Sequence, residues 1–287
     1  RLVGSEMCIR DSVHIVHAVG DIHTYKFYSF DYYDAVFCSG PGQAESLRRL
    51  EELRGTSHKD LPLLGCPYLD VYAARAEQVG VPEPRTILIA PTWGRNGLLT
   101  RTGSLVPKLL ASAGYHVILR PHPQSFISDR EVMERVAADL QTCKNVEWDR
   151  NPDGFSSLSR ASLMVSDVSG VIFDFAFVFL RPVISVGNGP LKEGFEAWEI
   201  PHEAWEMKAL DQIGRRVPAG NESVIPAVVE EMLGDLTTQT EAIRRVRDEN
   251  VVNFGYAGGP IADALVAAAQ AHSVQLQSSL PSSVEAA

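Results

Sequence analysis

The sequence predicts an α/β protein in which helices cover doubly wound parallel sheets. Beyond about residue 84, apolar runs of strand length alternate with segments of helical length and periodicity, which is the pattern of repeated βαβ units. Polar residues directly follow two of the apolar runs, in 120–123 and 166–170. Open sheets of this class bind ligands at the carboxyl ends of their strands, so we expect these two segments to border one site.

A first block of elements covers residues 13–72. Its apolar clusters and a leucine repeat at helical spacing predict strands at 13–16, 33–38 and 61–65 and a helix at 43–54. Three strands with so few helices make a small core. A helix running into a proline-containing linker at 73–83 separates this block from the next.

A second and more complete block covers residues 84–272. Its expected strands are 85–90, 115–119, 145–148, 161–165 and 181–186. Its expected helices are 104–113, 129–142, 155–160, 224–233, 238–250 and 260–271. Residues 273–287 are rich in serine and lack periodicity, which predicts a disordered tail.

Composition narrows the class of protein. The 287 residues are 45% hydrophobic and 22% charged, with no apolar run long enough to span a bilayer. The net charge of −10 argues against a nucleic-acid-binding surface, which is normally basic. The four cysteines lie far apart, without the spacing of a metal site, so we expect reduced thiols in a cytoplasmic protein.

The beginning of the chain is unusual. It starts at Arg1, and residues 1–12 resemble translated sequencing-adapter text from assembled environmental reads. We therefore expect residues 1–12 to be artefactual and residues 13–72 to be the remnant of a longer first domain. The strands of that remnant should then lack one covering layer and expose an apolar patch. The alternative is the ordinary start of a shorter protein.

Two histidines are the strongest catalytic candidates. His17 follows the first expected strand, just before a glycine-containing loop, where a side chain projects into the space beyond the sheet. His122 lies between Pro121 and Pro123, which restrict the backbone on both sides. Arg120 precedes His122 by two positions, which predicts that a forked cation for phosphate lies on the same side of the strand.

Hydroxyls, a glycine and carboxylates mark the expected start of a helix. Ser166, Ser169 and Gly170 allow close approach to phosphate oxygens, and a helix N-terminus offers free N–H groups. Asp167 would repel an anion, so we expect it to cap the helix or orient a neighbour. Asp174 can accept hydrogen bonds from ligand hydroxyls.

Residues 196–206 are rich in glutamate and tryptophan. We expect them to form a surface loop and helix, because unpaired carboxylates favour solvent. His202 within this segment has no partner at metal-ligand spacing in the sequence. The sequence therefore predicts no metal site.

Together these residues resemble the CDP-glycerol glycerophosphotransferase family, the teichoic-acid primases and polymerases. His17 corresponds to the histidine of the family's His-Gly motif, and residues 120–123 correspond to its second histidine motif. The Ala-Pro-Thr-Trp sequence at 90–93 is similar to another family segment, and residues 166–174 resemble its Asp-Tyr-Ser-Ser segment. The resemblance keeps the family's order over most of residues 13–262.

The resemblance implies a GT-B-type fold with two Rossmann-like domains, the first incomplete. Residues 13–72 would belong to the acceptor side and residues 84–272 to the donor-nucleotide side. It implies transfer of glycerol phosphate, or a related polyol phosphate, from a CDP-alcohol to a hydroxyl of a cell-envelope polymer such as teichoic acid. His17 and His122 would be the catalytic groups. The implied donor-binding residues are Ala18, Val19, Gly20, Pro91, Thr92, Arg120, Ser166, Ser169, Gly170 and Asp174.

The resemblance also implies the surroundings of the enzyme. Its partners would be the CDP-alcohol and a lipid-linked polyol-phosphate or glycan acceptor, with no metal, cofactor or nucleic acid. Its location would be cytoplasmic and peripheral on the inner face of the membrane, through the missing N-terminal region. The chain departs from the family pattern where Ala18 replaces a glycine, Tyr68 an arginine and Gly170 a serine. These differences leave the donor alcohol open.

Two other functions remain open from the sequence. One is a GT-B enzyme that uses a nucleotide sugar, either a glycosyltransferase or a protein like UDP-N-acetylglucosamine 2-epimerase. Breakage of the sugar C–O bond, rather than a P–O bond, would identify it. The other is a non-catalytic nucleotide-binding module.

Overall fold

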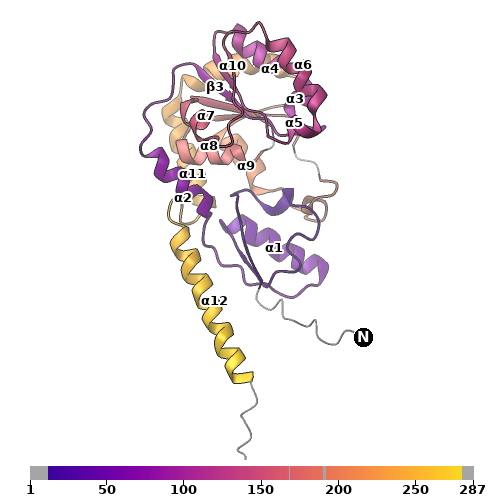
Figure 1. Ribbon diagram of the computed structural model, residues 1–287, viewed down its shortest axis with the longest axis vertical. Helices are drawn as coiled ribbons and strands as arrows, with labels where there is room; N and C mark the ends of the chain where they lie inside the picture. Colours follow the sequence, from indigo (N-terminus) through magenta and orange to yellow (C-terminus); the bar gives the residue numbers. More distant parts are fainter. Residues whose placement is uncertain (1–11, 168, 190–191, 280–287) are drawn as a thin grey trace, which may run out of the picture.

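The computed structural model describes residues 12–167, 169–189 and 192–279. Its strands form two parallel sheets in two lobes, one of two strands and one of six (Figure 1). The predicted α/β class with parallel sheets is confirmed. The proposed artefactual segment, except Ser12, lies outside the described residues.

The larger sheet contains six parallel strands in the order β5-β4-β3-β6-β7-β8. The strands are β3 (Thr86–Ile89), β4 (His116–Leu119), β5 (Val146–Trp148), β6 (Leu163–Ser166), β7 (Val183–Val186) and β8 (Gly214–Val217). Along the chain, β4 and β5 are added on one side of β3, and β6, β7 and β8 are then added on its other side. The strand order therefore reverses between β3 and β6, and ligands of such sheets bind at this switch point.

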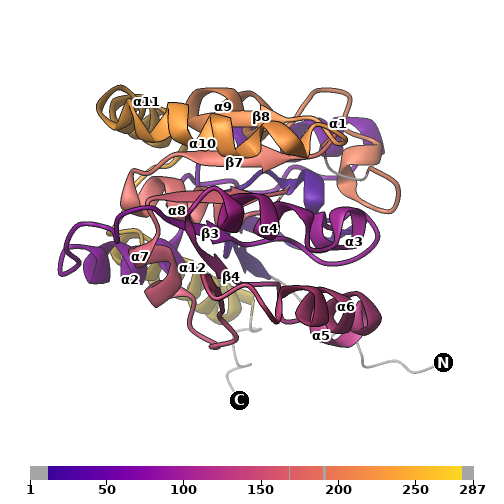
Figure 2. The same cartoon turned by 90° about the horizontal axis from the view of Figure 1, so that it is seen from above.

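Helices pack on both faces of this sheet (Figure 2). Ile87 and Ile89 of β3 point to one hydrophobic cluster, while Leu88 between them belongs to the cluster on the opposite face. This alternation follows from the two-residue repeat of a strand, and it explains why the strands are apolar throughout. The helices are α3 (Leu98–Thr102), α4 (Leu105–Ser112), α5 (Ser125–Ser128), α6 (Arg130–Leu140), α7 (Phe155–Arg160), α8 (Val171–Phe179), α9 (Trp205–Ile213), α10 (Ile225–Leu233) and α11 (Leu236–Asn250), with 3-10 turns η2 (Glu196–Trp198) and η3 (Glu222–Val224).

The smaller lobe is built on β1 (Val13–Ile15) and β2 (Ala35–Phe37). A 3-10 turn, η1 (Ile22–Thr24), and helix α1 (Pro41–Arg54) accompany them. The third strand predicted at 61–65 is wrong: only isolated bridges, Ala35 to Asp60 and Cys38 to Leu63, pair this segment with β2. Helix α2 (Pro67–Ala76) then leads back to the larger lobe.

A long C-terminal helix, α12 (Gly258–Ser279), runs away from the body of the molecule (Figure 1). Near its start, Ala257 and Ile261 bury Phe37, and Val13 and Ile15 pack against the same cluster. The other face of β1 and β2 packs against α1, so the expectation of one bare face is wrong. The helix also continues into the predicted disordered tail; residues 280–287 lie outside the described chain. No helix among the described residues has the length and apolar character needed to cross a membrane.

Helix α3 and strand β8 were not predicted from the sequence, and α9 lies mostly beyond the helix expected in residues 196–206. Strand β8 reads Gly-Arg-Arg-Val and has little apolar signal, because its two arginines are exposed at the edge of the sheet. Its pairing with β7 identifies it as a strand. Position in the sheet, and not local sequence, decides this element.

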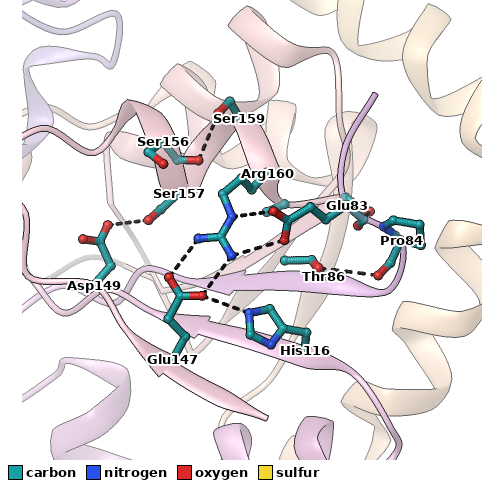
Figure 3. Close-up of polar contacts among 12 residues, drawn as sticks. Glu83, Pro84, Thr86, His116, Glu147, Asp149, Ser156, Ser157, Ser159 and Arg160 are labelled. Carbon is teal, nitrogen blue, oxygen red and sulfur yellow. Dashed lines mark hydrogen bonds and ion pairs between the residues drawn. The ribbon is translucent and has the colours of Figure 1, made fainter. Parts of the chain in front are cut away.

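An ion-pair network holds α7 against the edge of the larger sheet (Figure 3). The Arg160 guanidinium donates to both oxygens of Glu147 on β5, at 2.8 and 2.9 Å, and to both oxygens of Glu83 before β3, at 2.7 and 3.2 Å. His116 Nε2 lies 3.0 Å from the same Glu147 carboxylate. Arg160 lowers the pKa of Glu147, so this carboxylate stays ionised and the network is structural.

The two lobes meet where α9 begins. The backbone N–H of Asp21 donates to Glu206 Oε1 at 2.7 Å, linking the loop after β1 to α9. A Cβ atom on Gly20 would lie 2.6 Å from that same oxygen, so a larger residue here would displace the Glu206 carboxyl. On α1, a Cβ atom on Gly42 would lie 2.4 Å from Cδ1 of Trp205. Both glycines are therefore explained by this interface.

We expect Gly42→Ala to destabilise the protein by about 1–3 kcal/mol, because the new methyl group overpacks the interface. In a helix, alanine is more favourable than glycine by up to about 1 kcal/mol. Helix propensity alone would therefore predict that this variant is more stable, the opposite of what we expect. The Trp205 ring cannot move freely, since it packs on Phe173 at 5.2 Å between centroids. Urea denaturation measures the change. In the matched control, Gly80→Ala, the new Cβ meets nothing within 4 Å, so we expect a change within about 0.5 kcal/mol; equal effects would contradict the interface argument.

Candidate functional site

A buried carboxylate organises the switch point between β3 and β6. Asp167, which follows β6, is only 3% exposed. Its Oδ1 accepts the backbone N–H of Thr92 at 2.9 Å, and its Oδ2 accepts that of Leu98 at 2.7 Å. Burial raises its pKa while these two hydrogen bonds oppose the rise. Asp167 thus fixes the loop after β3, which is the orienting role expected from the sequence.

A cavity of about 560 Å³ lies beside this loop. Its size falls within the range of small-molecule sites. Most lining residues come from the loops after β3 and β7, and others come from η1, α3, the end of β7 and the segments after β6 and β8. The full lining is Thr24, Thr92, Trp93, Gly94, Arg95, Asn96, Arg101, Asp167, Val186, Gly187, Asn188, Gly189, Phe195 and Ala219. Of the implied donor-binding residues, Thr92 is among them. We call this space the large cavity.

A second and narrower pocket of about 80 Å³ lies between the lobes. Ser169 and Gly170, at the start of α8, form one wall, and Ala18 and Gly20 of the loop after β1 form another. The first N–H groups of a helix have no acceptor within it, so this wall favours an anion. Thr24 lines both this pocket and the large cavity. The fold therefore brings together four of the implied donor-binding residues across the two lobes.

His122 lies on the loop after β4, near the rim of the large cavity. Its Nδ1 accepts the backbone N–H of Gln124 at 3.1 Å, which leaves the proton of the neutral ring on Nε2. Partial burial lowers the pKa of His122. Its ring lies 6.4 Å from that of Trp93, which lines the large cavity. His122 is thus a neutral hydrogen-bond donor near neutral pH.

Arg120 does not share its direction with His122. Its guanidinium donates to Asp149 at 2.7 Å and to the carbonyl of Asn151 at 2.8 Å, both beyond β5. His122 instead lies beside the loop after β3. The two-residue alternation of a strand does not apply here, because β4 ends at Leu119. The expectation that Arg120 and His122 lie on the same side of the strand is therefore wrong.

Three further residues implied as donor ligands are buried in structural contacts. Ser166 is fully buried and donates to the carbonyl of Ala90 at 2.6 Å, which ties β6 to the end of β3. Val19 is 1% exposed and belongs to a hydrophobic cluster. Pro91 is buried, and its carbonyl accepts the N–H of His122 at 3.3 Å. These three residues therefore make structural contacts that stabilise the loops lining the site.

The remaining candidates lie toward the edges. His17 is exposed on the smaller lobe, and its ring packs edge-on against Tyr25 at 6.0 Å. Asp174 is partly exposed on the first turn of α8, and desolvation raises its pKa to about 7. Desolvation raises the pKa values of Cys66 and Tyr68, and the charge of Asp174 adds to both shifts. Asp174 therefore carries a proton through part of the neutral range.

Glu206 is a candidate that the sequence analysis missed. Its carboxyl lines the narrow pocket beside Gly20 and Ser169, and its Oε2 is buried with no hydrogen-bond partner among the described residues. Desolvation, with the charge of Asp21, raises the pKa of Glu206 to about 7. The expectation that residues 196–206 form a charged surface is wrong for Glu206. It is also wrong for Glu196, which is fully buried and paired with Arg54.

The fold also gathers His202 with three residues of the smaller lobe, Asp21, His23 and Ser46. His23 Nε2 lies 3.1 Å from the carbonyl oxygen of His202, and Ser46 Oγ lies 3.0 Å from His202 Nε2. Asp21 Oδ2 accepts from the same Ser46 hydroxyl at 3.0 Å. His202 is far from these residues in the sequence, so no spacing rule could have found the group.

Comparison with known proteins identifies the fold. Protein-family models give no match to this chain, and the curated proteins contain no sequence match. The solved structure of the wall teichoic acid polymerase TagF is similar with a TM-score of 0.58 at 17% identity, over 93% of this chain and 69% of that one. Two UDP-GlcNAc 2-epimerases, from Methanocaldococcus jannaschii and Neisseria meningitidis, have TM-scores of 0.51 and 0.54 at 16% and 14% identity.

Both epimerase matches cover 82% of this chain, which spans 61% and 62% of the epimerase chains, less than two thirds of their length. At these identities the likeness establishes the fold. The chain has an α/β architecture of the GT-B type, with Rossmann-like parallel sheets.

We expect Glu206→Gln to flatten the dependence of stability on pH. The raised pKa of Glu206, from 4.5 to about 7, means that the folded protein holds this proton more tightly than the unfolded chain does. The stability that this provides is complete below pH 4.5 and is lost as the pH rises through 7. Between pH 5 and 8, the variant should gain about 1–3 kcal/mol in free energy of unfolding relative to wild type.

Urea denaturation at both pH values measures this difference. The exposed Glu203→Gln serves as the control, because its carboxylate lies in the same segment without such burial. If the difference between the Glu206 variant and wild type stays constant from pH 5 to 8, Glu206 does not hold a proton in the folded state.

Proposed function

We propose that this chain is a transferase that moves glycerol phosphate, or a related polyol phosphate, from a CDP-alcohol to a hydroxyl of a cell-envelope polymer such as teichoic acid. One observation carries the proposal. The start of α8 faces the loop after β1 across the narrow pocket, and Thr24 lines both that pocket and the large cavity. The N-terminus of a helix can bind an anion, and here it lies beside a cavity large enough for a nucleoside. This combination suits a nucleoside diphosphate.

The two spaces suggest how the donor lies. Its pyrophosphate would contact the N–H groups at Ser169 and Gly170, while the cytidine would occupy the large cavity beside Thr92. Arg95 and Arg101 add positive charge to the wall of that cavity. This placement sets the β-phosphorus at the junction of the two lobes, where an acceptor can reach it from the smaller lobe.

The reaction needs a base for the acceptor and stabilisation of charge on the phosphates. The acceptor oxygen attacks the β-phosphorus, the bond from that phosphorus to the bridging oxygen breaks, and its electron pair leaves with CMP. His17, on the smaller lobe, takes the proton of the acceptor hydroxyl. His122 donates its Nε2 hydrogen to the phosphate charge that develops. As in other phosphoryl transfers, positioning and electrostatics supply most of the catalysis.

The acceptor and location follow from the same proposal. A growing polyol-phosphate or glycan chain, lipid-linked, would bind on the smaller lobe, and the enzyme would work at the inner face of the cell membrane. The fold shared with a wall teichoic acid polymerase supports this assignment.

A second candidate is a reaction like that of a UDP-GlcNAc 2-epimerase. The fold is also similar to those enzymes. In addition, the Glu206 carboxyl, with a pKa of about 7, lies in the narrow pocket where a sugar ring would sit. A carboxyl with such a pKa can exchange protons with a substrate near neutral pH.

Donor preference separates the two candidates. We expect calorimetry on the full chain, without added metal, to show binding of CDP-glycerol and CMP in preference to UDP-N-acetylglucosamine. No metal is added because the start of α8, with Arg95 and Arg101 on the wall of the large cavity, can supply the charge that the phosphates need. Release of CMP from CDP-glycerol, followed by chromatography, tests the reaction itself. Preference for the uridine nucleotide, or release of UDP, would replace the CDP-alcohol assignment with the second candidate.

Replacing His122 by alanine should lower the rate of CMP release on the order of 10²-fold, with a smaller effect on the Kd of CDP-glycerol. The imidazole donates to charge that grows in the transition state, so the chemical step loses more than binding does. His116→Ala is the matched control, since His116 lies at the opposite end of the same strand and contacts Glu147. Equal losses in both variants would remove His122 from the mechanism.

A further inference from the structure

A buried group of side chains between the lobes has the composition of a metal site. Asp21, His23 and His202 each offer one ligand atom, and these atoms all lie within 4.8 Å of one another. Asp21 and His23 come from the loop after β1, whereas His202 precedes α9. We call these three residues the Asp-His-His cluster. The transfer reaction proposed above assigns no role to these three residues.

The hydrogen bonds of His23 leave one ring nitrogen without a partner. Its Nε2 lies 3.1 Å from the carbonyl oxygen of His202, which can only accept, so this nitrogen carries the hydrogen. In the neutral ring, Nδ1 is then a bare lone pair. That atom is buried, without a hydrogen-bond partner among the described residues, and lies 3.3 Å from Asp21 Oδ2. Two acceptors at this distance repel each other unless a proton or a metal cation is shared between them.

The surrounding contacts hold the ligand atoms in place. The backbone N–H of Ile22 donates to Asp21 Oδ1 at 2.7 Å and leaves Oδ2 facing the cluster. The hydrogen bond from His23 to a backbone carbonyl is the contact that orients metal-binding histidines in proteins. The His23 side chain is only 5% exposed and that of Asp21 only 2%. Asp21 and His23 are therefore held in place before any cation arrives.

We propose that Asp21, His23 and His202 bind a divalent transition-metal ion, with Zn²⁺ the best match, and that the ion joins the two lobes. Two imidazoles and one carboxylate are ligands that Zn²⁺ accepts, with a fourth position for water. The ion replaces the repulsion between Nδ1 and Oδ2 with two bonds. This inference goes beyond the proposed transfer reaction and does not depend on it.

A route for the cation is present. A cavity of about 310 Å³ is lined by both Asp21 and His202. Its lining contains the carboxylates Glu45, Glu203 and Glu249 and one ammonium group, that of Lys208. An excess of carboxylates concentrates cations at such a surface. Asp21 lines both this cavity and the narrow pocket, so the ion would sit in the partition between them.

The test is equilibrium dialysis of the chelator-treated full chain against Zn²⁺ at neutral pH, followed by elemental analysis. We expect about one ion per chain, and a higher Tm in its presence. His202→Gln should weaken binding on the order of 10²-fold, because one ligand is lost. His58→Gln is the control: this side chain is 78% exposed, is paired with Glu51, and lies outside the cluster, so binding should not change.

A further variant distinguishes a metal from a shared proton. Ser46 Oγ lies 3.0 Å from both Asp21 Oδ2 and His202 Nε2, and it is not a predicted ligand. Ser46→Ala should keep the Zn²⁺ stoichiometry of wild type, and Co²⁺ in either protein should give the visible absorption of a nitrogen-containing site. If wild type binds no stoichiometric Zn²⁺ or Co²⁺, or if His202→Gln binds as wild type does, the proposal is wrong. A proton would then be the shared cation.

Discussion

The packing of residues 202–206 against the loop after β1 is the contact on which the rest of the site depends. The hydrogen bond from Asp21 to Glu206 and the close approach of Trp205 to Gly42 set the distance between the lobes. With that distance fixed, the narrow pocket acquires walls from both α8 and the loop after β1. The same packing removes the Glu206 carboxyl from water and shifts its pKa into the neutral range. One interface thus creates both the shape and the chemistry of the pocket.

The larger lobe supplies a rigid frame for this interface. Its sheet reverses direction between β3 and β6, so no helix crosses over the space at the ends of these strands. Asp167 occupies that space and holds the loop after β3 by two backbone hydrogen bonds. A carboxylate is well suited to the task, since its two oxygens can satisfy two separate N–H groups in a buried position. The loops that line the large cavity are consequently anchored to the core of the sheet.

Ionisable carboxyl groups recur around the candidate site. Asp174 and Glu206 both have pKa values raised to about 7 by desolvation, and Asp21 lies beside the imidazole of His23. Groups of this kind reduce stability at higher pH, and perturbed pKa values gather at functional sites. Carboxyl groups with pKa values near 7 can exchange protons with a bound substrate near neutral pH.

The sequence alone determined most secondary elements of the larger lobe, because apolar runs and helical periodicity are local properties. Strand β8 is an exception, since its Gly-Arg-Arg-Val sequence has little apolar signal. The sequence also located His122 and the start of α8, since both directly follow predicted strands. It could not give the direction of Arg120, which depends on where β4 ends, nor the burial of Ser166 and Val19.

Only the tertiary structure brought Glu206 within 2.7 Å of the Asp21 backbone, 185 residues away, and His202 within 3.1 Å of His23, 179 residues away. Burial and proximity are set by the packing of distant segments, and no local pattern of residues encodes them.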